Sequence, residues 1–223
     1  NAEVTVGSSK LSIEQQTNYP YTGTVKINCQ LTADLGTDNG SLHNILIRIP
    51  GWAVNKPVES DLYSYVNPTT MPVVIKIDNV EYQYEMNKGY AVIPGEIALG
   101  KDIEVQLPMD VHQVVSNANL TTNDGLRSYE RGPLVYCVEG VDNNNAVANI
   151  FIPENTTYTT STTLAGYFNG DMQQIKAKGF VKKLANGKDV IEESTVRLIP
   201  YFARAYRDNC AMKVWIPVDE SKI

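Results

Sequence analysis

The sequence is poor in the residues that most often carry catalysis or charge-driven binding. It has three cysteines, two histidines and four phenylalanines in 223 residues. Lysine and arginine number 19 against 25 acidic residues, the net charge is −6, and no basic run exceeds Lys182–Lys183. Nucleic-acid binding proteins gather basic residues on one face, and many membrane-surface helices do the same. We therefore expect neither nucleic acid nor a membrane as a partner.

Long apolar runs are also missing, since no stretch approaches the roughly 20 residues that cross a bilayer. The chain begins at Asn1 without a leader peptide, so we interpret it as a mature or excised fragment. Asn and Thr are frequent, and 13 tyrosines stand against four phenylalanines. This composition suits half-exposed strands and favours a periplasmic or secreted location.

The three cysteines do not form a recognisable ligand pattern. Cys29, Cys137 and Cys210 are far apart, with no CxxC or Cys/His spacing. Free cysteines usually behave as small buried hydrophobes. A disulfide between two of them stays open, because sequence cannot choose the pair. Structural zinc sites need clustered ligands, so we expect no metal and no other cofactor.

Catalytic groups are scarce as well. His43 lies near a hairpin turn and His112 near the middle of the chain, and no GxSxG, P-loop or GxGxxG stretch occurs. Paired carboxyl groups can carry out glycoside hydrolysis when they are held roughly 5 to 10 Å apart. The candidates Glu139, Glu192 and Glu193 lie in polar contexts typical of solvated residues. We expect no catalytic residue in this chain.

What the sequence does contain is a repeated period-two alternation of apolar and polar residues. Thr24–Leu31 alternates cleanly, which predicts a strand with its odd positions facing inward. Asp78–Asn79 and Asn186–Gly187 are turn signals. About seven short strands up to Met109, followed by a second set, predict an all-β protein. The expected fold is two consecutive antiparallel β-sandwich, jelly-roll-like domains, residues 1–109 and 110–223.

For four further segments, the distribution of polar and apolar residues predicts either a strand or a connection. Glu81–Glu85 is predicted as a polar strand, and Ala211–Ile216 as the last strand. Asn117–Arg131 and Asn155–Thr163 are mostly polar and predict connections.

Four aromatic residues are candidates for contact with sugar. Trp52, Tyr63, Tyr65 and Tyr90 follow or flank strand ends, and aromatic faces with polar edges suit stacking on sugar rings. Alternatively, Trp52 closes the end of a sandwich and the tyrosines cover its face. Trp215 is expected to pack at the interface between the two domains.

Three ordered motifs go beyond these generalities. They are Gln15–Gly23, Leu46–Ala53 and Arg131–Glu139, and the order continues through Gly89–Tyr90, Leu107–Met109, Pro200–Phe202 and Met212–Ile216. Together these segments resemble glycoside hydrolase family 127, the β-L-arabinofuranosidase-like enzymes. The resemblance spans essentially the whole chain.

The resemblance implies that a catalytic part lies elsewhere. Members of that family have an N-terminal (α/α) barrel followed by β-sandwich domains, and their nucleophilic cysteine and zinc ligands belong to the barrel. This chain is similar to the sandwiches alone, and Cys137 falls in a sandwich motif, so no catalytic role transfers to it. The first hypothesis is a non-catalytic accessory region that supports a missing N-terminal barrel, and a homodimer, in carbohydrate degradation.

Two alternatives remain open at this stage. One is a carbohydrate-binding module that contacts polysaccharide through the surface aromatics. The other is a free-standing enzyme, which requires a cleft with converging acid and base groups.

Overall fold

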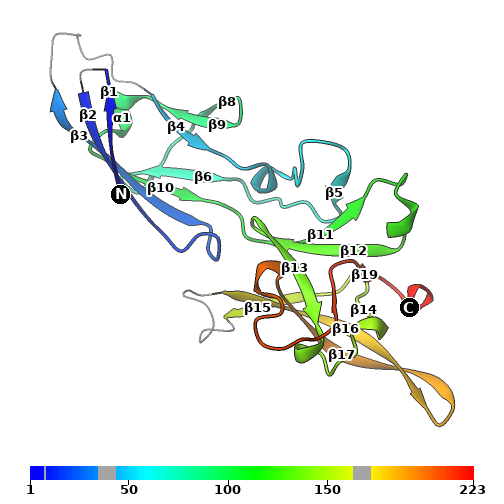
Figure 1. Ribbon diagram of the computed structural model, residues 1–223. Coiled ribbons are helices and arrows are strands. Elements are labelled where there is room, and N and C mark those ends of the chain that lie inside the picture. The colour runs from blue at the N-terminus through cyan, green and yellow to red at the C-terminus, as the bar shows by residue number, and fades with distance from the viewer. Residues whose placement is uncertain (8, 35–43, 163–171) are drawn as a thin grey trace. The chain divides into compact units, whose positions relative to one another are not determined.

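The computed structural model describes residues 1–7, 9–34, 44–162 and 172–223 (Figure 1). The chain divides into two compact units, one formed by residues 1–54 and 69–109 and the other by residues 55–68 and 110–223. The strand pattern assigns residues 55–68 to the first domain, whereas their contacts belong to the second unit. Among the candidates named above, His43 lies outside the described residues.

The first unit consists of two antiparallel sheets. One has the order β1–β2–β3–β10–β6–β7 and the other the order β4–β9–β8. The bounds in the larger sheet are β1 Ala2–Val6, β2 Ser9–Thr17, β3 Thr24–Asp34, β10 Asp102–Gln106, β6 Val74–Ile77 and β7 Val80–Glu81. Those in the smaller sheet are β4 Ile45–Arg48, β9 Tyr90–Ile93 and β8 Glu85–Asn87. Two short helices follow strands, η1 Gly51–Val54 and α1 Gly95–Ala98.

The core of the first unit is built from the inward positions of these strands. Ile103 and Val105 of β10 pack in one cluster with Ile47 of β4 and Ile93 of β9. Ile27 of β3, which pairs with Ile103, joins the same cluster. The two sheets therefore bury one face each against the other, as expected for a sandwich.

The second unit is organised around one large antiparallel sheet. Its main path is β14–β16–β17–β13–β12–β11–β5, to which β15, β18 and β19 add. The bounds are β5 Tyr63–Tyr65, β11 Val111–Ser116, β12 Leu126–Arg131, β13 Leu134–Glu139, β14 Ile150–Phe151, β15 Tyr158–Thr162, β16 Gln173–Ala185, β17 Lys188–Pro200, β18 Met212–Lys213 and β19 Ile216–Pro217. The short 3-10 helices are η2 Thr121–Asn123, η3 Gly140–Asp142, η4 Val147–Asn149, η5 Tyr201–Ala203 and η6 Glu220–Lys222. The predicted all-β, antiparallel fold class is confirmed.

Several local predictions differ from the structure because polar strands resemble loops. Leu126–Arg131 and Tyr158–Thr162 are strands within segments predicted as connections. Glu81–Glu85 is not one strand, since only its ends join strands, in β7 and β8. The last predicted strand is divided into β18 and β19, which pair with different partners, β13 and β12. In each case, pairing with a distant strand determines whether the segment is a strand and where it ends, and the local sequence pattern does not.

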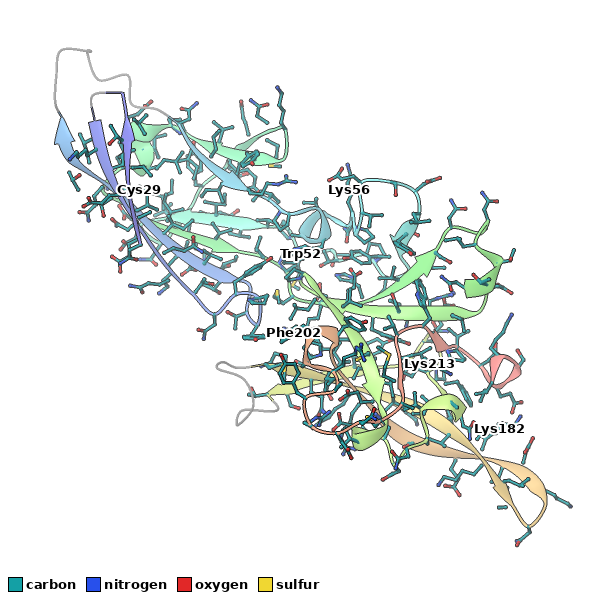
Figure 2. All side chains as sticks on the ribbon, viewed as in Figure 1. Cys29, Trp52, Lys56, Lys182, Phe202 and Lys213 are labelled. Atoms are coloured by element: carbon teal, nitrogen blue, oxygen red, sulfur yellow. The ribbon has the colours of Figure 1, made fainter. Side chains whose placement is uncertain are left out.

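The hairpin β16–β17 is the longest element of the second unit. Its strands stay in register from the pair Ile175–Leu198 to the pair Ala185–Lys188. Asn186 and Gly187 have φ angles of 53° and 74°, which confirms the predicted tight turn. The base is buried and the tip is exposed. Figure 2 shows Lys182 on the part of this hairpin that extends beyond the rest of its unit.

Candidate functional site

The four aromatic candidates are divided between the two units. Trp52 and Tyr90 belong to the first unit, whereas Tyr63 and Tyr65 lie on β5 of the second. Each of the four makes a specific contact within its own unit. We therefore describe the two groups separately.

In the first unit, Trp52 on η1 is half-buried and packs against the core. Its ring stacks on Tyr19, with centroids 6.5 Å apart and an interplanar angle of 23°. Tyr90 is 39% exposed, and the guanidinium of Arg48 lies over its ring at 5.5 Å. Arg48 is itself oriented, because its Nη1 donates to the carbonyl of Gly89 at 2.7 Å. Tyr90 is thus the more accessible of the two aromatic residues.

In the second unit, β5 carries both tyrosines on one face. Tyr63 contacts Trp215 with ring centroids 5.8 Å apart. Tyr65 stacks on His112 at 4.2 Å, and its hydroxyl donates to Glu130 Oε2 at 2.9 Å. His112 and Glu130 are paired across β11 and β12. The segment 55–68 is therefore attached to this sheet by ring stacking and by a charge-assisted hydrogen bond.

Burial sets the protonation of the Tyr65–Glu130 pair. It raises the pKa of the Glu130 carboxyl, and the hydrogen bond from Tyr65 opposes that rise. The pKa of Tyr65 is also raised, first by burial and then by the adjacent carboxylate. His112 is 3% exposed, and its Nδ1 lies 2.9 Å from the carbonyl oxygen of Asn67. These groups hold one another in place, which is a structural use of ionisable side chains.

A second ionic cluster lies in the same unit and corrects one expectation. Glu139 is buried, with a side chain only 3% exposed, and is not the solvated residue that its sequence context predicts. Arg207 donates to Glu139 at 2.9 Å and to both carboxylate oxygens of Asp142. The backbone N–H of Ala205 donates to the other Glu139 oxygen. The hydrogen bonds that Arg207 donates to Asp142, and then to Glu139, raise the pKa of its guanidinium.

Sequence reasoning missed this cluster because its partners are 65 and 68 residues apart. The available signal was Glu139 itself, a carboxylate at the end of an apolar strand, which requires a cation when buried. Glu192 and Glu193 are exposed, as predicted, and pair with Lys183 and Lys178.

The cysteines are all free thiols. Cys29 and Cys137 are buried and Cys210 is half-buried. Burial raises the pKa of the Cys137 thiol to about 12, so it is protonated near neutral pH and is a poor nucleophile. In the described ranges, no three or more His, Cys, Asp or Glu side chains are grouped to hold a metal ion. Within the same ranges, no helix is long and apolar enough to span a membrane.

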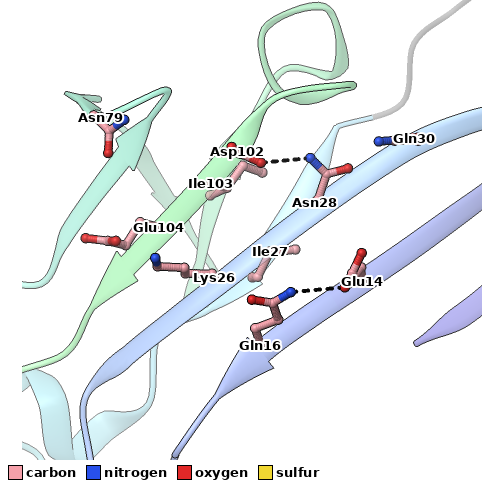
Figure 3. A pocket seen from close by; sticks show the side chains of 10 residues that line it. All are labelled: Glu14, Gln16, Lys26, Ile27, Asn28, Gln30, Asn79, Asp102, Ile103 and Glu104. Carbon is pink, nitrogen blue, oxygen red and sulfur yellow. Dashed lines mark hydrogen bonds between the residues drawn. The ribbon is translucent and has the colours of Figure 1, made fainter.

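A shallow groove of about 510 Å³ lies on the outer face of the larger sheet of the first unit (Figure 3). Its lining residues are mostly amide and charged ones from β2, β3 and β10, together with Ile27, Ile103 and Asn79. Asn28 donates to Asp102 at 3.0 Å and Gln16 donates to Glu14 at 3.1 Å. These lateral pairs satisfy one another. Such a polar surface is typical of the solvated face of an antiparallel sheet.

The matches to family models cover nearly the whole chain. Residues 1–109 match the β-L-arabinofuranosidase GH127 middle domain, and residues 111–217 match the glycoside hydrolase family 127 C-terminal domain. The chain belongs to glycoside hydrolase family 127. The resemblance inferred from the ordered motifs is confirmed.

Relatives of this GH127 chain are longer than the chain itself. It is 28% identical over 222 residues to a non-reducing end β-L-arabinofuranosidase of Bifidobacterium longum subsp. longum, covering 93% of the chain and 30% of that protein. A solved GH127 β-arabinofuranosidase is 28% identical with a TM-score of 0.86, covering 99% of this chain and 34% of the other.

A second solved relative shares the fold. It is a GH127 β-L-arabinofuranosidase from Geobacillus stearothermophilus T6, 23% identical with a TM-score of 0.75, covering 97% of this chain and 32% of the other. This GH127 chain therefore spans about a third of the length of these relatives.

Proposed function

We propose that this chain is the accessory β-sandwich region of a β-L-arabinofuranosidase-like glycoside hydrolase and supports a catalytic barrel in another part of the same polypeptide. The observation that carries the proposal is the pair of matches to a middle and a C-terminal domain. The relatives also bear glycosidase names and are about three times as long.

The chemistry of the described residues supports this proposal. Two sets of buried ionisable groups are engaged in structural pairs, Arg207 with Glu139 and Tyr65 with Glu130. In most glycosidase families, two carboxyl groups face a substrate cleft and carry out the reaction. Glu139 instead has both of its oxygens bonded within the fold. These arrangements stabilise a scaffold.

The test compares this chain with the full-length parent. Release of nitrophenol from a nitrophenyl β-L-arabinofuranoside is measured for the chain, for the parent and for the parent lacking this region. We expect turnover by the parent alone, and soluble parent without this region to be less thermally stable. Turnover by the isolated chain would overturn the proposal.

A second candidate function is contact with polysaccharide, and the exposure of Tyr90 favours it. An exposed phenol ring next to an oriented guanidinium offers both a stacking face and hydrogen-bond donors. Binding to arabinose-containing polysaccharides is measured by calorimetry for the native chain, Tyr90→Ala and Trp52→Ala. Loss of binding in Tyr90→Ala with retention in Trp52→Ala supports this candidate. An absence of binding across the panel eliminates it.

A further inference from the structure

Three strands at the start of the chain carry an apolar face. We call β1, the first half of β2 and the last half of β3 the N-terminal wing, and we define its apolar face as Val4, Val6, Leu11, Ile13 and Leu31. Register places these side chains together, since Val4 pairs with Leu11, Leu11 with Leu31 and Ile13 with Cys29. The opposite face is polar, with Glu3, Thr5, Lys10, Ser12 and Gln30.

This face continues the buried face of the same sheet. Farther along β3, Val25 and Ile27 occupy equivalent positions and pack against the core of the first unit. Among the described residues, that core cluster includes no member of the apolar face of the wing. Val4 is 38% exposed and Leu31 is 46% exposed. The alternation that normally specifies burial thus continues beyond the core cluster that the described residues of this unit form.

An apolar face of this kind is a candidate for an interaction surface. Contiguous exposed apolar residues on an otherwise polar protein mark contact sites for other polypeptide. The strand β1 is also the end strand of its sheet in the described order, so its outer edge adjoins the same region. Uncovered edges are normally protected in native proteins.

We propose that the polypeptide preceding the middle domain in the full-length parent packs on the apolar face of the N-terminal wing. This rests on the proposed function, because it requires that this region be joined to a preceding part. The match of residues 1–109 to a middle domain implies such a part, and the relatives contain about twice this chain's length besides. A segment joined at β1 reaches the wing as an intramolecular partner, at high effective concentration.

The experiment uses the same substitutions in two contexts. The double variant Val4→Glu/Leu31→Glu is made in the 223-residue chain and in the full-length parent. The control, Thr5→Glu/Gln30→Glu, places the same charges on the opposite face of the same strands. Hydrogen exchange of residues 2–13 and thermal unfolding are measured for every protein.

We expect residues 2–13 to exchange about tenfold or more slowly in the native parent than in the chain alone. The Val4/Leu31 variant should lose this protection and lower the Tm of the parent, while leaving the Tm of the chain unchanged. The control variant should keep both the slow exchange of residues 2–13 and the native Tm in the parent. Equal exchange in parent and chain overturns the proposal.

Two further outcomes are diagnostic. If the chain alone sediments as a dimer that the Val4/Leu31 variant dissociates, the face binds a second copy and the proposal is wrong. If the parent shows protection of the wing but no arabinofuranosidase activity, docking stands and the proposed function fails.

Discussion

At the scale of single residues, the buried cluster around Arg207 predicts a large effect on stability. Arg207→Ala leaves the Glu139 carboxylate buried without its cation, which costs about 3 kcal/mol in similar buried pairs. We expect urea unfolding to show a loss of that order, because Ala cannot replace the bonds to Glu139 and Asp142.

The matched control for this prediction is Lys183→Ala. It removes an ion pair with Glu192 in which both side chains are more than half exposed, and exposed pairs contribute little. If Lys183→Ala lowers the unfolding free energy as much as Arg207→Ala does, burial does not explain the effect of Arg207.

The Tyr65–Glu130 pair predicts a dependence of stability on pH. Because burial raises the folded-state pKa of Glu130, the folded state holds its proton to higher pH than the unfolded state. The unfolding free energy therefore falls as pH rises from the ordinary carboxyl range through the raised pKa. Glu130→Gln keeps an acceptor for Tyr65 and removes this titration.

The measurement is the difference in unfolding free energy between Glu130→Gln and the native chain at a series of pH values. We expect the variant to gain relative stability from about pH 4.5 upward, where unfolded glutamate ionises, and then to reach a plateau. A difference that is constant with pH would refute the raised pKa.

At the scale of elements, the β16–β17 hairpin predicts a contrast between two leucines. Leu198 at its base is fully buried in the core, whereas Leu184 near its tip is 76% exposed. Leu198→Ala should cost about 2–5 kcal/mol, and Leu184→Ala should stay within about 0.5 kcal/mol. Chemical denaturation of both variants checks this, and similar losses would show that the tip is covered.

The elements also show which predictions from sequence succeed. The alternation in Thr24–Leu31 correctly placed Val25, Ile27 and Cys29 inward, because a strand has only two faces. Asp78–Asn79 has φ angles of 49° and 68°, and these residue types tolerate that conformation. Such signals depend on neighbouring residues alone, so they can be recognised without knowing which distant strands pair.

Polar strands and distant contacts could not be predicted in the same way. Leu126–Arg131 is a strand because β11 and β13 flank it, not because its residues alternate. Of the candidate sugar-contact residues, Tyr63 and Tyr65 proved to be engaged with Trp215, His112 and Glu130. A role in sugar binding stays a prediction for all four candidates, Trp52, Tyr63, Tyr65 and Tyr90.

At the scale of the whole chain, the assignment of residues 55–68 to the second unit predicts complementation. A fragment of residues 110–223 lacks β5, which pairs with β11 through Tyr65 and Val114. It also lacks the Tyr65 ring and hydroxyl that contact His112 and Glu130. We expect this fragment to unfold at a lower temperature than the second unit does in the intact chain.

A synthetic peptide of residues 55–68 should raise the Tm of that fragment in a concentration-dependent manner, as a ligand of the folded state does. The peptide with Tyr65→Ala is the control and should raise it less. A fragment that is indifferent to the native peptide would show that β5 adds nothing to the unit.

The sequence by itself determined the all-β class, the tight turns and the family, because period-two alternation, turn residues and ordered motifs are properties of neighbouring residues. Tertiary structure decided that residues 55–68 join the second unit, that Glu139 is buried against Arg207, and that the inward-facing Leu31 is exposed. Each of these depends on which distant segment covers a face. Period-two patterning states that a face is to be buried, but only the folded chain determines what is available to bury it.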